Sequence, residues 1–335
     1  MTIYILKDTK SSHLATSFYV DYVCNKLGFK TLVHVNSPHD IPNGSWIFLY
    51  QSKDLFKSLF TKKKLKTLTW FQGVLPEEAL LIKKSTLRYY AWCFLEKIAL
   101  KKSDWCLFVS DAMRFHYRSK YNYVNNNFSI APCINRLNPN CSDFKNLFWT
   151  TRPEFSFIYA GSTHDWQCIR EMLTIFNHIK KNVCESATLV FVTENIVETE
   201  NSLFREDVSN IKFISLSGEK LDCELKKHRF GFLLRRDSNI NHVATPTKMS
   251  TYLSSGVMPI VTDAVDIFKD LKLGEHNLAF ESKLIDQPAA FCNHLLEIVS
   301  VNNIDLEIKN LISEYFMKIN SYFYKLNSPL KKKFD

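Results

Sequence analysis

The residues with the clearest chemistry lie near one predicted strand-to-helix connection in the second half of the chain. An apolar strand over 230–234 ends in Arg235, and a polar loop containing Asn241 leads to a helix over 247–255. Lys248 lies in the first turn of that helix. Two cations at a strand end and a helix start could bind an anion, and a diphosphate is the natural fit.

The start of this helix adds to the predicted anion site. Thr245 is predicted to be the N-cap residue and Pro246 the first helical residue, where its missing N–H costs little. The N–H groups of Thr247 and Lys248 would then lie at the positive end of the helix dipole. Gly256 suits the C-terminal end. The competing interpretation is an ordinary capped helix with solvent-exposed basic neighbours.

Carboxylates and histidines offer acid–base chemistry. Glu77 and Glu78 begin a predicted helix over 77–102 and could act on a hydroxyl as general acid or base. Carboxylates in a first helical turn also simply favour the helix dipole, which is the competing interpretation. His116 and His164 are secondary candidates, although a lone histidine is more often structural. The sequence has no Asp-x-Asp motif for a metal ion, so no metal site is predicted.

The elements that must position these residues alternate between strands and helices. In the first half, strands are predicted at 3–6, 30–35, 46–50, 66–71, 105–109 and 128–131, and helices at 12–27, 54–60, 77–102 and after the N-cap residue Ser110. In the second half, strands are predicted at 155–159, 188–192, 211–216, 230–234 and 258–262, and helices at 167–181, 247–255 and 305–326. This alternation is typical of parallel sheets covered by helices.

The length predicts the number of domains. A chain of 335 residues exceeds the roughly 250–300 residues that one core reaches, so we expect two α/β domains, at 1–150 and 151–304. The polar stretch 135–153 is expected to link them, and residues 305–335 to form a final helix. Ligands bind outside the carboxyl ends of the strands in such sheets, which predicts a cleft between the domains.

The composition excludes several classes of protein. With 46% hydrophobic residues, the chain is neither disordered nor fibrous. No apolar run approaches the roughly 18 residues of a membrane span, and the N-terminus lacks the pattern of a signal peptide. Nine cysteines without a Cys-x-x-Cys pair argue against a zinc ribbon or a disulfide framework. Reduced thiols indicate a cytoplasmic location.

The positive charge is concentrated in the first half. Residues 1–150 hold 21 Lys and Arg against 10 Asp and Glu, a net +11, whereas the remainder carries −2. The densest groups are Lys62 to Lys66, Lys83 to Arg88, and Lys97 to Lys102. Such asymmetry favours an anionic partner, and an anionic membrane surface fits. No nucleic-acid-binding module is present, so no nucleic acid is expected. The competing interpretation is a solvated lysine-rich surface.

Three segments, in order, resemble glycosyltransferases of the GT-B fold, family 4 (group 1) type, of bacterial surface polysaccharide pathways. The first is Trp70-Phe-Gln-Gly-Val-Leu-Pro-Glu-Glu78, followed by 99–104 and Val109-Ser110. The second is Tyr159-Ala-Gly-Ser-Thr-His-Asp-Trp-Gln167. The third is Gly231-Phe-Leu-Leu-Arg-Arg through Gly256 and the strand Pro259-Ile-Val.

The resemblance implies two Rossmann-like parallel-sheet domains facing a central cleft, with the last helix packing back on the N-terminal domain. It implies a transferase that moves a sugar from a UDP- or GDP-sugar to a glycan or lipid-linked acceptor, with retention and without a metal. Such enzymes make capsule, O-antigen or lipopolysaccharide. The nucleotide sugar would be a substrate, and no cofactor would be bound permanently.

The resemblance also implies roles for residues. Gly161 and Ser162 would approach the diphosphate, beside Arg235, Asn241 and the helix start at 245–248. Ser215 and Leu216 would hold the nucleobase. Gln72 replaces a histidine of the family's acceptor domain, next to Gly73.

Two positions depart from the family pattern. Many members carry two glutamates there, and this chain has Val243 and Thr251. An alternative therefore stays open, in which the chain is a non-catalytic protein or an epimerase-like enzyme that binds a sugar nucleotide on the same fold.

Overall fold

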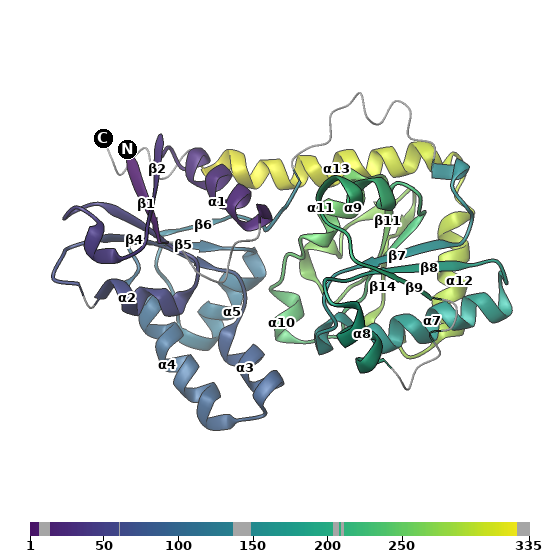
Figure 1. The fold of residues 1–335 in the computed structure, drawn as a ribbon, viewed down its shortest axis with the longest axis horizontal. Coiled ribbons are helices and arrows are strands. Elements are labelled where there is room, and N and C mark those ends of the chain that lie inside the picture. The colour runs from purple at the N-terminus through teal and green to yellow at the C-terminus, as the bar shows by residue number, and fades with distance from the viewer. Residues whose placement is uncertain (7–13, 60, 137–148, 204–207, 209–210, 327–335) are drawn as a thin grey trace. The chain divides into compact units, whose positions relative to one another are not determined.

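The structure is a computed structural model that describes residues 1–6, 14–59, 61–136, 149–203, 208 and 211–326 (Figure 1). The chain divides into two compact units. Unit 1 comprises Met1–Asn135, His242–Thr245 and the chain from Lys318. Unit 2 comprises Arg136–Asn241 and Pro246–Met317. Much of the expected linker over 135–153 lies outside the described residues.

Unit 1 contains a six-stranded parallel sheet in the order β2-β1-β3-β4-β5-β6. Its strands are β1 (Thr2–Leu6), β2 (Thr31–Val35), β3 (Trp46–Leu49), β4 (Lys66–Phe71), β5 (Trp105–Phe108) and β6 (Phe128–Ile130). Strands β3 and β5 are buried along their whole length. Their unbroken apolar runs fit a sheet that is covered on both faces.

The helices of unit 1 connect these strands. They are α1 (Leu14–Lys26), α2 (Leu55–Leu59), α3 (Leu75–Lys83), α4 (Thr86–Lys102) and α5 (Asp111–Tyr121). Ser110 caps α5 as predicted, because its Oγ accepts a hydrogen bond from Met113 N at 3.0 Å.

The single helix predicted over 77–102 is wrong. Lys84 has a left-handed φ of 48°, which ends α3, and Ser85 then begins α4 by accepting a hydrogen bond from Arg88 N. The apolar stripe runs through both helices, and the serine cap was the signal that marks the break. Helices α3 and α4 lie side by side (Figure 1).

Unit 2 contains a second six-stranded parallel sheet, in the order β14-β11-β10-β7-β8-β9. Its strands are β7 (Ser156–Ala160), β8 (Thr188–Val192), β9 (Ile211–Ile214), β10 (Phe230–Leu233), β11 (Met258–Thr262) and β14 (Ala279–Phe280). The short strands β12 (Lys272–Leu273) and β13 (His276–Asn277) form an antiparallel hairpin. Strand β14 and this hairpin were not predicted.

The helices of unit 2 are α7 (Ile169–Asn182), α8 (Ile196–Ser202), α9 (Gly218–Leu225), α10 (Asn239–His242), α11 (Lys248–Ser254) and α12 (Pro288–Val299). Helix α7 buries Ile169, Met172, Leu173, Ile175, Phe176 and Ile179, a spacing of three and four residues that places them on one face. Each such side chain contributes about 1.5–3 kcal/mol on burial. Helices α7 and α12 lie side by side (Figure 1).

The last helix, α13 (Ile304–Leu326), belongs to both units. Its final turns from Lys318 pack within unit 1, where the ring of Phe323 lies edge-on to Tyr22 at 5.0 Å. Tyr322 donates a hydrogen bond to Asp111 at 3.2 Å. No described helix is long and apolar enough to cross a membrane.

Candidate functional site

The strand order of the unit 2 sheet reverses between β7 and β10. Strands β7, β8 and β9 extend to one side, and β10, β11 and β14 extend to the other. Strands β7 and β10 pair only at Ile158–Gly231 and Phe157–Phe230, so they separate toward their carboxyl ends. Ligands of doubly wound sheets bind outside the carboxyl ends of strands at this point.

Tyr252 of α11 fills the gap between the separating strands. Its hydroxyl accepts a hydrogen bond from Ala160 N and donates one to Phe232 O, each at 3.2 Å. The ring passes so close to Gly231 that a Cβ there would lie 2.7 Å from it. A glycine at 231 therefore lets α11 approach the sheet and places Lys248, one turn earlier, at the carboxyl end of β7.

Lys248 lies against Gly161 at the end of β7. A Cβ on Gly161 would lie 2.6 Å from Cε and Nζ of Lys248, and the φ of Gly161, 149°, also favours glycine. The ammonium donates to Gln167 Oε1 at 2.8 Å and lies 3.8 Å from the ring centroid of Tyr159. Desolvation by burial and the nearby Arg235 charge hold the pKa of Lys248 well below its ordinary range.

Arg235 is a buried cation beside Lys248. It is 4% exposed, and its Nη1 donates to the carbonyl of Leu234 at 2.7 Å. Burial lowers the pKa of its guanidinium. In the described part of the chain, neither Arg235 nor Lys248 has a carboxylate partner. Two desolvated cations without an anion are costly, so this arrangement suits an anionic ligand.

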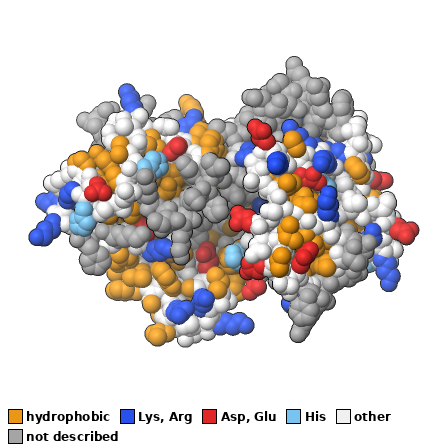
Figure 2. Space-filling view, in the orientation of Figure 1, with side chains coloured by type: hydrophobic (Ala, Val, Ile, Leu, Met, Phe, Trp, Pro, Cys, Tyr) orange, Lys and Arg blue, Asp and Glu red, His pale blue; other side chains and the backbone are white. Residues whose placement is uncertain are grey.

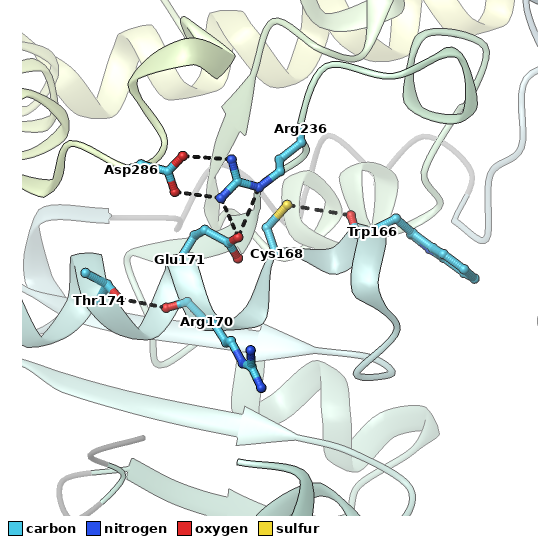
Figure 3. Close-up of polar contacts among 7 residues, drawn as sticks. All are labelled: Trp166, Cys168, Arg170, Glu171, Thr174, Arg236 and Asp286. Carbon is cyan, nitrogen blue, oxygen red and sulfur yellow. Dashed lines mark hydrogen bonds and ion pairs between the residues drawn. The ribbon is translucent and has the colours of Figure 1, made fainter. Parts of the chain in front are cut away.

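The adjacent Arg236 shows the contrast (Figure 3). Its guanidinium donates to Glu171 at 2.7 Å and to both carboxylate oxygens of Asp286, at 2.6 and 2.8 Å. Arg236 is therefore neutralised within unit 2, where it ties α7 to the segment before α12. The sequence presents two arginines in a row, and only the structure distinguishes the unpaired one.

The predicted cap of the following helix is wrong. Helix α11 begins at Lys248, and its N-cap position is Thr247, whose side chain makes no capping bond. Thr245 instead accepts a hydrogen bond from Cys133 N at 2.9 Å. Pro246 precedes the helix, and its carbonyl accepts a hydrogen bond from Met249 N. A helix of seven residues has a weak dipole, so the side chains of Arg235 and Lys248 carry the site. Gly256 ends α11 as predicted, with a φ of 65°.

The remaining predicted donor residues lie at other places in the structure. Asn241 is buried and holds the loop, because its Nδ2 donates to Arg236 O at 2.8 Å. Ser162 is exposed, and its carbonyl accepts a bond from the Tyr159 hydroxyl at 2.5 Å. His164 is exposed and stacks on Trp166. Ser215 and Leu216 follow β9, two strands from β7, about 10 Å along the same sheet edge.

Unit 1 holds a separate cavity of about 250 Å³ at the carboxyl ends of β3 and β4. Its lining contains Gln51, Ser52, Trp70, Phe71, Gln72, Gly73, Leu75 and Glu78. Gln72 donates to Tyr50 O at 2.8 Å, which joins the two strand ends. The indole N–H of Trp70 is buried and has no hydrogen-bond partner among the described residues.

Glu78 is the carboxylate that lines this cavity. Its Oε1 lies 2.0 Å from where a Cβ on Gly73 would be, so glycine at 73 gives the carboxyl its place. Burial raises the pKa of Glu78, and the charge of Glu77 raises it further. A carboxyl with a raised pKa beside a cavity is a candidate general acid or base.

Glu77 lies outside the cavity lining, in a separate cluster of charged residues. Its Oε1 accepts a hydrogen bond from Lys120 at 2.6 Å and lies 3.3 Å from His116 Nε2. Burial alone would raise the pKa of Glu77, but the bonds to His116 and Lys120 lower it overall. The structure thus separates the adjacent glutamates and assigns His116 to Glu77.

The same cluster includes a residue that the sequence analysis missed. Glu96 is 1% exposed and accepts hydrogen bonds from Tyr117 at 3.0 Å and Tyr121 at 2.8 Å. Burial raises its pKa to about 7. The available signal was that Glu96 is the sole acidic residue between 79 and 102.

The comparisons with known proteins place this geometry in a fold. No family model and no curated protein matches the sequence. Among solved structures, sucrose-phosphate synthase from Thermosynechococcus elongatus superposes with a TM-score of 0.72 at 10% identity, over 100% of this chain and 99% of its own. An E. coli structure described as trehalose-6-phosphate bound with UDP-2-fluoro glucose superposes with a TM-score of 0.68 at 6% identity. The match covers 99% of this chain and 98% of the E. coli chain.

A third similar structure is a mutant of S. aureus TarM in complex with fondaparinux, α-GlcNAc-glycerol and UDP. It gives a TM-score of 0.59 at 10% identity and covers 87% of this chain, which spans 57% of the TarM chain. The chain therefore has the GT-B fold, with two Rossmann-like parallel-sheet domains, as the sequence resemblance implied.

Proposed function

We propose that this protein is a glycosyltransferase that moves a sugar from a nucleotide-sugar donor to a hydroxyl of a glycan or lipid-linked acceptor. The observation that carries the proposal is the pair of cations, buried Arg235 and half-buried Lys248, without a carboxylate partner in the described chain. The pair lies at the reversal of strand order in unit 2. A sugar transferase must neutralise the diphosphate that leaves, and two preorganised, partly desolvated cations would do so.

The donor is proposed to lie along the edge of the unit 2 sheet. Its diphosphate would contact Arg235 and Lys248, and the backbone at Gly161 would approach it closely because no side chain intervenes. The nucleobase would reach Ser215 and Leu216 at the end of β9. Three of the similar structures hold UDP or a UDP-sugar, which favours UDP over GDP as the first donor to test.

The acceptor is proposed to bind unit 1 at the cavity beside Glu78. The raised pKa of this carboxyl favours its protonated form, which suits a group that gives a proton to, or takes one from, an acceptor hydroxyl. Gln72 and the unpaired indole N–H of Trp70 would orient sugar hydroxyls there.

The finer parts of the proposal follow from the family resemblance. We propose that transfer proceeds with retention and without a metal ion, in the cytoplasm, and that it builds a surface polysaccharide such as capsule, O-antigen or lipopolysaccharide. No group of three His, Cys, Asp or Glu side chains suited to a metal ion occurs among the described residues. Arg235 and Lys248 supply the positive charge that a metal ion would otherwise supply.

Nucleotide binding tests the donor site directly. Thermal unfolding would be followed with UDP, GDP and their sugars, each with and without EDTA, for the wild type and Lys248→Met. The exposed Lys181→Met, on α7 of the same unit, is the matched control. A ligand at about 100 times its Kd should stabilise the fold by about 2.7 kcal/mol. We expect stabilisation by UDP compounds that persists in EDTA and is lost only in Lys248→Met.

A second assay separates transfer from binding. Release of nucleoside diphosphate would be measured with and without glycan acceptors, and NMR would give the anomeric configuration of the product. Binding without acceptor-dependent release would favour the alternative, a sugar-nucleotide-binding protein or an epimerase-like enzyme. The residues at the two departing positions, Val243 and Thr251, are both buried. Equal binding by wild type and Lys248→Met would overturn the donor site.

A further inference from the structure

An exposed apolar surface covers the helical hairpin of α3 and α4. Six large apolar side chains are 36–80% exposed there: Leu80, Leu81, Ile82, Leu87, Tyr90 and Phe94. Helices α3 and α4 expose three each, and so does α13, where the three are spread over its length; every other helix or strand exposes at most one among the described side chains. In Figure 2, hydrophobic side chains gather at the lower left, where Figure 1 places α4. We call these six residues the hairpin surface.

The spacing on α4 shows that one face of its first half is apolar and exposed. Leu87, Tyr90 and Phe94 stand at i, i+3 and i+7, which places them on one face. The buried residues of this helix are Glu96, Ala99 and Leu100. A helix on the surface of a protein ordinarily presents polar residues to water, so a clustered apolar face marks an interaction site.

From residue 79 to residue 102 of the hairpin, the exposed charges are all positive. Between residues 79 and 102 the exposed charged side chains are Lys83, Lys84, Arg88, Lys97, Lys101 and Lys102. The one carboxylate in this stretch, Glu96, is buried against Tyr117 and Tyr121. The surface thus combines exposed leucine, isoleucine, tyrosine and phenylalanine with unopposed basic residues.

We infer that the hairpin surface docks on an anionic lipid bilayer. Apolar side chains of an interfacial helix enter the boundary between headgroups and acyl chains, and Lys and Arg contact anionic headgroups. A second copy of this chain would bring like charges together at the same face, which disfavours self-association there. The inference deepens the proposed function, because a lipid-linked acceptor lies in a membrane. It rests on the proposed function only for the biological reason to dock. Docking itself requires no transfer.

Co-sedimentation with vesicles tests the inference. The full chain would be mixed with phosphatidylcholine vesicles, and with vesicles of phosphatidylcholine and phosphatidylglycerol. One variant, Leu87→Ser/Tyr90→Ser/Phe94→Ser, removes the apolar face. A second, Lys83→Gln/Lys84→Gln/Arg88→Gln, removes three charges. Its matched control, Lys181→Gln/Lys212→Gln/Lys220→Gln, removes three exposed lysines of unit 2.

We expect the wild type to bind the phosphatidylglycerol vesicles and to release them as salt rises. Each variant of the hairpin should bind at least about tenfold more weakly, because both apolar area and basic charge contribute. The control should bind as the wild type does. Circular dichroism and UDP binding on the same samples report folding and the donor site, so failure of either proposal is seen separately.

Three results would overturn the inference. The wild type could fail to bind anionic vesicles, or the apolar variant could bind as tightly as the wild type. Light scattering could also show a dimer that the apolar variant abolishes, which would assign the hairpin surface to a second copy of the chain.

Discussion

The end of the Lys248 side chain occupies the space that a side chain at Gly161 would need. Cε and Nζ lie 2.6 Å from an ideal Cβ at 161, over the ring of Tyr159. The glycine at the end of β7 and the lysine at the start of α11 are 87 residues apart in sequence. Their contact positions the ammonium at the carboxyl end of β7, near Arg235.

Gly161→Ala tests this relationship. The new methyl group would displace the lysine, and its φ would be strained, at a cost of about 1–3 kcal/mol of stability. We expect UDP affinity to fall at least tenfold as Lys248 moves. Gly44→Ala is the control, since its φ is 80° and nothing lies within 4 Å of its new Cβ. Calorimetric titration with UDP measures the effect, and equal losses in both variants would argue against the contact.

Lys248 also predicts a pH dependence of donor binding. Its pKa is depressed, so its ammonium loses its proton at a lower pH than an ordinary lysine, and the attraction for a diphosphate is then lost. UDP affinity should therefore fall as pH rises through that depressed value. Lys248→Met should bind weakly and show a flatter profile over the same range. A wild-type profile as flat as that of the variant would contradict the assignment.

Glu96 predicts a pH dependence of stability in unit 1. Its folded pKa, about 7, is above the ordinary value of 4.5, so the folded state holds the proton more tightly. The contribution of Glu96 to the free energy of unfolding is therefore fully present below about pH 4.5. It decreases by about 3 kcal/mol as the pH rises through the folded pKa. Glu96→Gln should not show this decrease, so its stability relative to the wild type should rise between about pH 5 and pH 8. Urea unfolding measures it, and exposed Glu219→Gln, which should track the wild type, is the control.

Arg152 predicts a purely structural effect. The side chain is 9% exposed and donates to three carbonyls, of His228 at 2.6 Å, Gly256 at 2.8 Å and Ser255 at 3.0 Å. Arg152→Met would leave those acceptors unpaired, so we expect a loss of about 3 kcal/mol or more in urea unfolding. Exposed Arg118→Met is the control and should unfold within about 0.5 kcal/mol of the wild type. A similar small change for Arg152→Met would show that water replaces the guanidinium.

Glu78→Gln separates chemistry from donor binding. The amide keeps the size of the side chain beside Gly73 but cannot exchange a proton, so kcat should fall by about 10²–10⁴. UDP affinity should stay unchanged, because Glu78 lies in unit 1. Glu77→Gln is the comparison, and it should lower stability through loss of the bond to Lys120. If Glu77→Gln lowered kcat as Glu78→Gln does while the fold stayed intact, the assignment of Glu78 would be wrong.

The sequence by itself determined the class of fold. Apolar runs such as 188–192 and 258–262 coincide with β8 and β11 because parallel strands that are covered on both faces are predominantly apolar. The strand-to-helix connection between Gly231 and Gly256 also predicted Arg235 and Lys248 as anion-binding residues. Short strands such as β14, and the break between α3 and α4, were missed because local pattern is weak where tertiary contacts decide.

Only the tertiary structure decided which charges are free. Arg235 and Arg236 are adjacent in sequence, yet Glu171 and Asp286 neutralise one and leave the other buried without a carboxylate. Glu77 and Glu78 are likewise in different environments, since Glu77 accepts a hydrogen bond from Lys120 and Glu78 lines the cavity. Pairing and burial depend on residues distant along the chain, and these two quantities set the cost and the reactivity of a charge.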